Sequence, residues 1–130
     1  MPFIDRTVDN ILKGKISITQ LKHGFRYGFD AVFLAAFVNS FLLKYKIKDV
    51  LLADVGSGVG TISLIIAYKN KKIKLTAIEN NDQYLELAKE NIINNNFQRQ
   101  INLLNSDVFT IKKNLLNTFD IIVSNPPFYK

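Results

Sequence analysis

The sequence predicts an α/β fold built on a parallel sheet, because two features recur through its second part. Short apolar runs, beginning with 50–53, alternate with helix-like segments, and the loops between them are short. A short continuous apolar run is typical of a strand buried on both faces. Strand–helix–strand units with short loops form right-handed crossovers in a parallel sheet, and such sheets bind ligands at the carboxyl ends of their strands.

The chain is long enough for one hydrophobic core and too short for two ordinary domains. It has 130 residues, of which 48% are hydrophobic and 22% charged, a composition that excludes intrinsic disorder. The absence of cysteine excludes a disulfide scaffold, and the single histidine, His23, argues against a His-based metal site or a Ser/His triad. We therefore expect one domain over 1–130, with a lead-in at 1–48, a ligand-binding part at 49–130 and no metal.

The lead-in contains one strand-like segment and one strongly apolar helix. Ile16 to Thr19 alternates between apolar and polar residues, as half of a β-hairpin would. Asp30 is a good N-cap for the helix that follows, from Ala31 to about Leu43. Because this helix is apolar on most of its faces, we expect it to be buried.

After Asp49 the pattern becomes regular and predicts a four-stranded sheet. The expected elements are strands at 50–53, 73–78, 101–104 and 119–123, a glycine loop at 56–60, helices at 61–68 and 82–95, and a helical or irregular segment at 109–116. The helix at 82–95 is amphipathic, so it covers the sheet with one face only.

The charge excess gives little information about partners. Lys and Arg number 17 against 11 Asp and Glu, but the lysine clusters at 44–48 and 69–74 precede strands and so lie opposite the expected binding edge. The best membrane candidate, 31–38, is far shorter than the about 20 apolar residues that cross a bilayer. Charged residues within 5–9 occupy the place of a signal peptide's apolar region. The sequence predicts a cytoplasmic protein without a membrane segment.

The segment from Asp54 to Gly60, DVGSGVG, joins the first of these strands to a helix. Its glycines, Gly56, Gly58 and Gly60, allow a sharp turn and a close approach of the backbone to a ligand. The N–H groups that begin the next helix can bind an anion such as a carboxylate, and Asp54 is placed to accept hydrogen bonds from an ammonium group. Thr61 stands where the dinucleotide fingerprint has its third glycine, which disfavours NAD.

Two further acidic residues follow strands and so reach the same edge of the sheet. Glu79 ends the second strand, where a carboxylate can bind both hydroxyls of a ribose. Asp107 follows the third strand and can accept from an adenine amino group while Val108 or Phe109 packs on the ring. Alternatively, Asp107 is a turn residue or an N-cap for the segment that follows.

The tetrad Asn125-Pro126-Pro127-Phe128 follows the fourth strand. Proline has a fixed φ and no N–H, so the Pro126 carbonyl lies bare beside the Asn125 side-chain amide. Two neighbouring acceptors can hold both hydrogens of a planar amino group and aim its nitrogen lone pair at an electrophilic methyl group, while Phe128 stacks on the substrate. The tetrad is therefore suited to present a planar amine to a methyl donor, and this interpretation is favoured over a simple Pro-rich turn after a strand.

These motifs together resemble those of class I S-adenosylmethionine-dependent methyltransferases that methylate exocyclic or amide nitrogens. The segment from Leu21 to Ala36, LKHGFRYGFDAVFLAA, is similar to the one that precedes the cofactor domain in bacterial tRNA adenine-N6 methyltransferases. Those enzymes act on an adenine beside the anticodon of a valine tRNA. The resemblance extends from about Asp9 to Phe128 and implies a Rossmann-like parallel sheet, S-adenosylmethionine as cofactor, and methylation of an adenine N6 in tRNA.

The resemblance also implies a role for each motif residue. In the cofactor site, Asp54, Gly56, Gly58 and Gly60 would hold the methionine part, Glu79 the ribose, and Asp107 and Val108 the adenine, with Arg26 and Tyr27 closing the site. In the catalytic tetrad, Asn125 and Pro126 would bind the target amine, followed by Pro127, and Phe128 would stack on the target base. Adenine N6 is a weak nucleophile, so catalysis would rest on orientation and desolvation, and the target base would leave its stack.

Methyltransferase domains of this class have seven strands, whereas this sequence predicts four. We therefore interpret 1–130 as the N-terminal half of such an enzyme, truncated after the fourth strand, with 119–123 as an exposed apolar edge. A second chain would then supply the missing strands. Two alternatives stay open: a methyltransferase for a glutamine amide or another nucleobase, since the tetrad suits any planar amine, and a non-catalytic remnant or half-enzyme that needs a partner.

Overall fold

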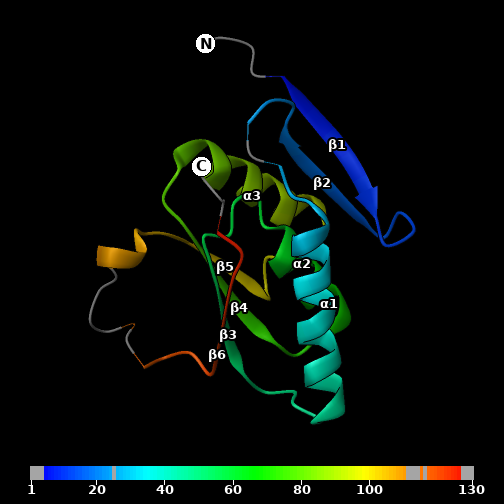
Figure 1. The fold of residues 1–130 in the computed structure, drawn as a ribbon, viewed down its shortest axis with the longest axis vertical. Coiled ribbons are helices and arrows are strands. Elements are labelled where there is room, and N and C mark those ends of the chain that lie inside the picture. Colours follow the sequence, from blue (N-terminus) through cyan, green and yellow to red (C-terminus); the bar gives the residue numbers. More distant parts are fainter. Residues whose placement is uncertain (1–4, 25, 111–114, 116, 127–130) are drawn as a thin grey trace.

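The computed structural model describes residues 5–24, 26–110, 115 and 117–126 (Figure 1). Its elements are β1 (Arg6–Ile11), β2 (Ile16–Leu21), α1 (Phe29–Lys44), β3 (Leu51–Val55), α2 (Thr61–Lys69), β4 (Lys74–Glu79), α3 (Asp82–Asn94), β5 (Ile101–Asn105), the short 3-10 helix η1 (Val108–Thr110) and β6 (Ile121–Ser124). The strands and α-helices that the sequence predicts are present, with ends that shift by at most two residues.

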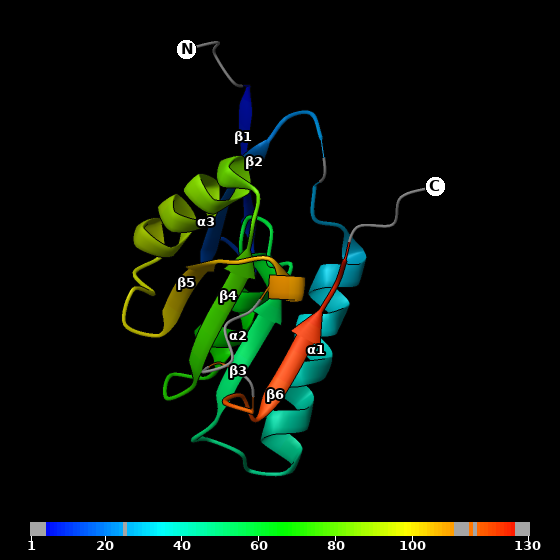
Figure 2. The ribbon, with the colours of Figure 1, turned by 90° about the vertical axis from the view of Figure 1, so that its left-hand side faces the viewer.

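Within the described residues, four strands form a parallel sheet in the order β5-β4-β3-β6, which confirms the predicted architecture. β3 lies inside the sheet, and its residues Leu52, Ala53 and Asp54 are buried. α2 joins β3 to β4, and α3 joins β4 to β5. Figure 2 shows the sheet with α1 and α2 behind it and with the carboxyl ends of all its strands pointing toward the N-terminal hairpin.

The lead-in forms the antiparallel hairpin β1–β2, as the alternation at Ile16 to Thr19 predicts. β2 is buried along almost its whole length, whereas β1 alternates between exposed and half-buried residues. Ile16, Ile18 and Leu21 join the hydrophobic cluster that also contains apolar residues of α1, α2 and α3. The hairpin therefore shares one core with the parallel sheet.

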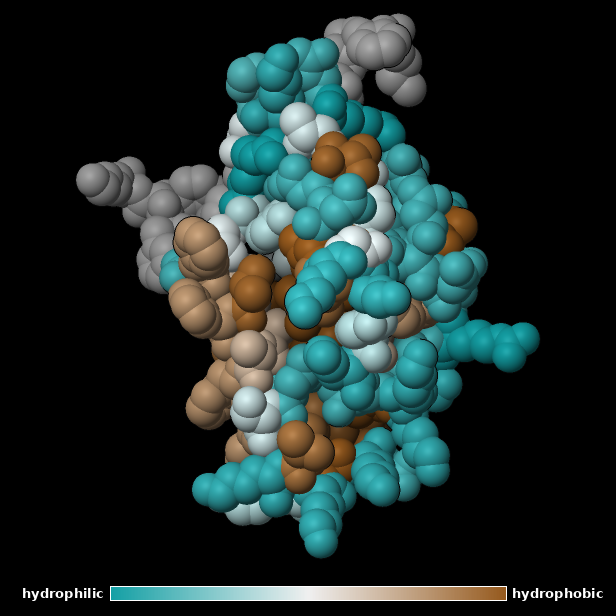
Figure 3. Space-filling model, turned by 90° about the vertical axis from the view of Figure 1, so that its right-hand side faces the viewer, coloured by the Kyte–Doolittle hydropathy of each residue, from teal (hydrophilic) through white to brown (hydrophobic). Residues whose placement is uncertain are grey.

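The expectation that the apolar helix of the lead-in is buried is wrong. α1 buries one narrow face of small and aliphatic residues: Ala31, Ala35, Val38 and Leu42. Another side exposes an aromatic ridge, by which we mean Phe29, Phe33, Phe37 and Phe41, exposed by 81%, 68%, 68% and 41%. Apolar side chains line this edge of the molecule in Figure 3, because none of the described elements packs over them. Asp30 is not the N-cap either: the helix starts at Phe29, two residues earlier than expected, and Gly28 is its N-cap.

β6 is the edge strand that the sequence predicts. It pairs with β3 on one side, and within the described chain its other side meets no strand. Ile122 is 66% exposed, and α1, with its aromatic ridge, lies behind this side of the sheet (Figure 2). An open apolar edge can pair with another polypeptide, and both β6 and the ridge lack a cover among the described residues.

Candidate active site

The glycine loop lies at the carboxyl end of β3 and leads into α2. The N–H groups of Gly56 and Ser57 both donate to the Ile78 carbonyl on β4, at 2.8 and 3.0 Å, which folds the loop toward the end of the neighbouring strand. Gly56 and Gly58 have φ angles of +68° and +57°, which other residues rarely adopt. Apart from chain neighbours, no atom of the described residues lies within 4 Å of where a Cβ would stand at either glycine. The loop therefore faces open space that a ligand can enter.

Replacing Gly58 with alanine is expected to weaken cofactor binding far more than folding. An alanine in the left-handed backbone conformation lowers the free energy of unfolding by about 1 kcal/mol. In a chain of this size that lowers the Tm by about 4 °C. The new methyl group stands in the open space before the loop, so we expect S-adenosylmethionine to bind at least about tenfold more weakly, or about 1.4 kcal/mol. Thermal unfolding and titration calorimetry measure the two effects. Unchanged affinity would show that the cofactor does not approach this loop.

Glu79, at the end of β4, is fixed against the glycine loop. Its Oε2 accepts from the Gly58 N–H at 2.8 Å, and its Oε1 accepts from the N–H groups of Asn80 and Asn81, both at 3.0 Å. Backbone donors thus orient a carboxylate that stays half-exposed. Each carboxylate oxygen has two lone pairs, so the two backbone donors fill Oε1, whereas Oε2 keeps one lone pair that can accept from a ligand hydroxyl.

Asp54 is the buried acid beneath the loop. Its side chain is 1% exposed, its Oδ2 accepts from the Ser63 hydroxyl at 2.7 Å, and its Oδ1 has no hydrogen-bond partner among the described residues. Burial raises the pKa of Asp54 to about 6, with hydrogen bonds from Ser63 opposing the shift and the nearby charge of Glu79 adding to it. Asp54 is therefore mainly ionised at pH 7, and an ammonium group nearby would favour that form further.

The lead-in, the glycine loop and the end of β6 meet at one cavity. Its lining consists of Tyr27, Ala31, Gly56, Ser57, Gly58, Val59, Thr61, Ile62, Tyr84 and Asn125. The structure thus brings together three of the predicted features: Tyr27, the loop and the first residue of the tetrad. Sequence reasoning missed Tyr84 as a site residue, although its position four residues before buried Ala88 on α3 indicates that it faces the loop.

Several buried oxygens at this loop lack a partner within the described chain: Asp54 Oδ1, Ser57 Oγ and Thr61 Oγ1. Buried polar atoms are nearly always hydrogen-bonded in folded proteins, so these atoms fit a polar ligand. The methionine part of S-adenosylmethionine offers an ammonium donor to the carboxylate and a carboxylate acceptor to the two hydroxyls. The residues present therefore fit this cofactor.

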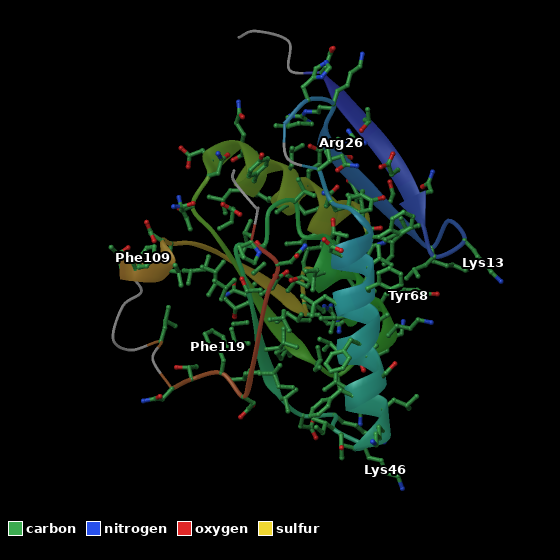
Figure 4. All side chains as sticks on the ribbon, in the orientation of Figure 1. Lys13, Arg26, Lys46, Tyr68, Phe109 and Phe119 are labelled. Carbon is green, nitrogen blue, oxygen red and sulfur yellow. The ribbon has the colours of Figure 1, made fainter. Side chains whose placement is uncertain are left out.

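Arg26 does not line the cavity and instead contacts the hairpin (Figure 4). Its Nη1 donates to Thr7 Oγ1 at 2.8 Å and to the Leu21 carbonyl at 2.7 Å, and its Nη2 lies 3.4 Å from Asp9 Oδ2. The hydroxyl of Tyr27 donates to the same Asp9 oxygen at 3.4 Å. Arg26 therefore holds the segment between β2 and α1 against the hairpin, next to Tyr27, which does line the cavity.

Asp107 follows β5 and caps η1. Its Oδ1 accepts from the Phe109 N–H at 2.9 Å, and its carbonyl accepts from the Thr110 N–H at 3.0 Å, which is the N-cap that the sequence left as the alternative. Val108 is 51% and Phe109 93% exposed, and Figure 4 shows Phe109 far from the sheet. Among the described residues, Asp107, Val108 and Phe109 are not part of the cavity lining. Their contact with adenine therefore stays a prediction.

Asn125 and Pro126 follow β6, whereas Pro127 and Phe128 lie outside the described residues. β6 pairs with β3 up to Val55 and Ser124, and the Ser124 hydroxyl donates to the Val55 carbonyl at 3.0 Å. This register ends both strands together, so Asn125 emerges beside the glycine loop.

The lysine clusters lie at the other end of the sheet, as expected. Lys46, Lys48, Lys69, Lys71 and Lys72 line a separate hollow of about 920 Å³. Among the described residues, no group of His, Cys, Asp and Glu side chains could hold a metal ion. A search of the same residues finds no helix with the length and apolarity to span a membrane.

Comparison with known proteins gives matches over most of the chain. The profile of the methyltransferase small domain family matches residues 34–130. A tRNA1(Val) (adenine(37)-N6)-methyltransferase of a Flavobacteriaceae bacterium is 32% identical over 116 residues, which cover 89% of this chain and 47% of the relative. A release factor glutamine methyltransferase of Fusobacterium nucleatum is 34% identical over 87 residues, which cover 66% and 24%. The chain thus spans less than half the length of these relatives.

A solved structure of a SAM-dependent methyltransferase from Agrobacterium tumefaciens has the same fold. It superposes with a TM-score of 0.77 at 15% identity, over 98% of this chain and 41% of that one. An identity this low supports the fold alone.

Proposed function

Because this chain belongs to the methyltransferase small domain family, we propose that it is the cofactor-binding half of an S-adenosylmethionine-dependent N-methyltransferase acting on the N6 amino group of an adenine in tRNA. The observation that carries the proposal is the meeting of the glycine loop, bound by Glu79, with Asn125 at the carboxyl ends of β3, β4 and β6. This edge offers groups for a cofactor and, beside them, an acceptor for a planar amine.

S-adenosylmethionine, the cofactor of this family, supplies the electrophilic methyl group when it is bound. Asp54 would accept from the ammonium group of the methionine part, and Oε2 of Glu79 would accept from a ribose hydroxyl. Asn125 Oδ1 and the Pro126 carbonyl would accept the two amine hydrogens, which turns the nitrogen lone pair out of the ring plane. Because the N6 lone pair is delocalised, these residues contribute through orientation and exclusion of water rather than through a strong base.

The tRNA substrate is supported by the lead-in. The alignment with the Flavobacteriaceae tRNA methyltransferase covers 116 residues and therefore extends well into residues 1–48. A glutamine amide or another nucleobase is the alternative substrate, since both present a planar amine to the same pair of acceptors. The relative that methylates a release factor glutamine supports that alternative.

The rest of the enzyme would dock on the open side of the fold. The relatives are more than twice as long as the matched region, β6 has an unpaired edge within the described sheet, and the aromatic ridge of α1 is exposed. A further polypeptide that adds a strand to β6 and covers the ridge would complete the pocket for the target base. A non-catalytic remnant that only binds the cofactor is the alternative.

Replacing Asn125 with alanine is expected to abolish methyl transfer and to leave cofactor affinity within about twofold, because the side chain holds the amine rather than the cofactor. The assay combines this chain with the second half of the Flavobacteriaceae relative and labelled S-adenosylmethionine, in parallel reactions with unmodified tRNA and with a translation release factor. Mass spectrometry identifies the labelled nucleoside or side chain. The proposal expects N6-methyladenosine from the parent pair only. Label on a release factor glutamine would establish the alternative substrate, and cofactor binding without any transfer would favour the remnant.

A further inference from the structure

A buried asparagine on α3 joins the glycine loop to the N-terminal hairpin. Asn91 is 0% exposed. Its Oδ1 accepts from the Thr19 N–H at 2.8 Å, and its Nδ2 donates to the Thr19 carbonyl at 2.9 Å and to the Val59 carbonyl at 3.0 Å. One side-chain amide thus binds β2 of the hairpin and the loop that faces the cofactor cavity.

Asn95, four residues later, bonds to the hairpin in the same way but makes no bond to the glycine loop among the described residues. Its Oδ1 accepts from the Ser17 N–H at 2.9 Å, and its Nδ2 donates to the Ser17 carbonyl at 2.7 Å and to the Asn91 carbonyl at 2.7 Å. Four residues of helix rise by about 6 Å and two residues of strand by about 6.8 Å, so the amides of Asn91 in α3 and of its C-cap Asn95 match alternate residues of β2. β1 pairs with one edge of β2, and these two amides supply hydrogen-bond partners for the backbone along its other edge.

The carbonyl that Asn91 holds lies between the two glycines that shape the loop. Gly58, before it, is bound by Glu79, and Gly60, after it, is the N-cap of α2 with a φ of +92°. A Cβ at Gly60 would lie 3.9 Å from the Cβ of Ala88 on α3. The same face of α3 therefore supports the back of the loop, opposite the side that a cofactor enters.

We propose that Asn91 is a positioning residue that couples the hairpin to the cofactor loop. Its hydrogen bond to the Val59 carbonyl fixes the turn that faces the cavity. When that turn becomes ordered, the bonds of the same side chain to Thr19 order the backbone of β2 as well. A buried amide that loses one partner is costly, so the loop and the hairpin order together. The effect on cofactor affinity rests on the proposed function, whereas the coupling of loop and hairpin rests on this chain's own contacts.

The test compares Asn91→Ala with Asn95→Ala in the 130-residue chain, using amide hydrogen exchange and titration calorimetry. Each variant should speed exchange at the hairpin amide that donates to the removed side chain: Thr19 in Asn91→Ala and Ser17 in Asn95→Ala. Only Asn91→Ala should speed exchange at the Gly60 amide, which donates to the Ser57 carbonyl in the loop. It should also weaken S-adenosylmethionine binding at least about tenfold, whereas Asn95→Ala should stay within about twofold. In the parent, the cofactor should slow exchange at Thr19, and in Asn91→Ala it should not.

Equal exchange at Gly60 in the two variants would overturn the proposal and leave both asparagines with a structural role only. If the parent does not bind the cofactor, the proposed function fails, while exchange at Gly60 and Thr19 still decides the coupling. If Asn91→Ala does not fold, Asn91→Ser, which keeps one donor, takes its place with the same expectations at Gly60.

Discussion

Replacing Asp54 with asparagine is expected to stabilise the chain at neutral pH and to weaken its binding of S-adenosylmethionine. The pKa of Asp54 in the folded chain is about 6, above the ordinary value of 3.8. Between these values the folded state binds more protons than the unfolded state, so the stability contributed by this group is complete below about pH 4 and is lost as the pH rises through about 6. The shift corresponds to roughly 3 kcal/mol at pH 7 as an upper bound. Asparagine removes the buried charge and keeps an acceptor for Ser63.

Urea unfolding of parent and variant at pH 4.5 and pH 7.5 measures this effect. We expect the stability gain of Asp54→Asn to be larger at pH 7.5, and Asp49→Asn, at an exposed position, to show no such difference. Cofactor affinity of the parent should fall as the pH drops below about 6, because Asp54 loses the charge that attracts the ammonium group. An equal gain at both pH values, or full cofactor affinity in the variant, would contradict the role given to Asp54.

Replacing Phe33 and Phe37 together with lysine is expected to suppress self-association of the chain. Both side chains are 68% exposed on the aromatic ridge, and a large exposed apolar patch beside an open strand edge favours association. Lysine is a better helix former than phenylalanine, so the double variant should fold as stably as the parent. Sedimentation over a range of concentrations should show association of the parent and a monomeric double variant.

Ile93→Lys is the matched control for the ridge, because Ile93 is 46% exposed on α3. It should associate as the parent does. A parent that stays monomeric at every concentration, or a double variant that associates equally, would show that the ridge is not a contact surface.

The parallel sheet and the glycine loop were predictable because their signals are local. The apolar runs at β3, β4 and β5 and the spacing of Gly56, Gly58 and Gly60 are read directly from neighbouring residues. The burial of α1 was not predictable, since hydrophobicity gives the preference of a side chain but not whether another element covers it. The aromatic ridge is exposed because none of the described elements covers it.

The contacts of single side chains depended on pairings between distant segments. Arg26 bonds to the hairpin because β1 and β2 place Thr7 and Leu21 next to it. The sequence predicts the hairpin but not which side chains will contact it. Asn91 lies in α3 and Asn95 is the C-cap of that helix, which has many polar residues, so buried and exposed amides have the same signature in the sequence. Only the packing of α3 against β2 distinguishes them.

Titration calorimetry of S-adenosylmethionine against the purified 130-residue chain tests whether the glycine loop forms the cofactor site. We expect binding to one site per chain, with an affinity that falls below about pH 6 as Asp54 is protonated and that falls at least about tenfold in Gly58→Ala. A folded chain that binds no S-adenosylmethionine, or binds it equally with and without the Gly58 substitution, would contradict the assignment of the cofactor site to this loop.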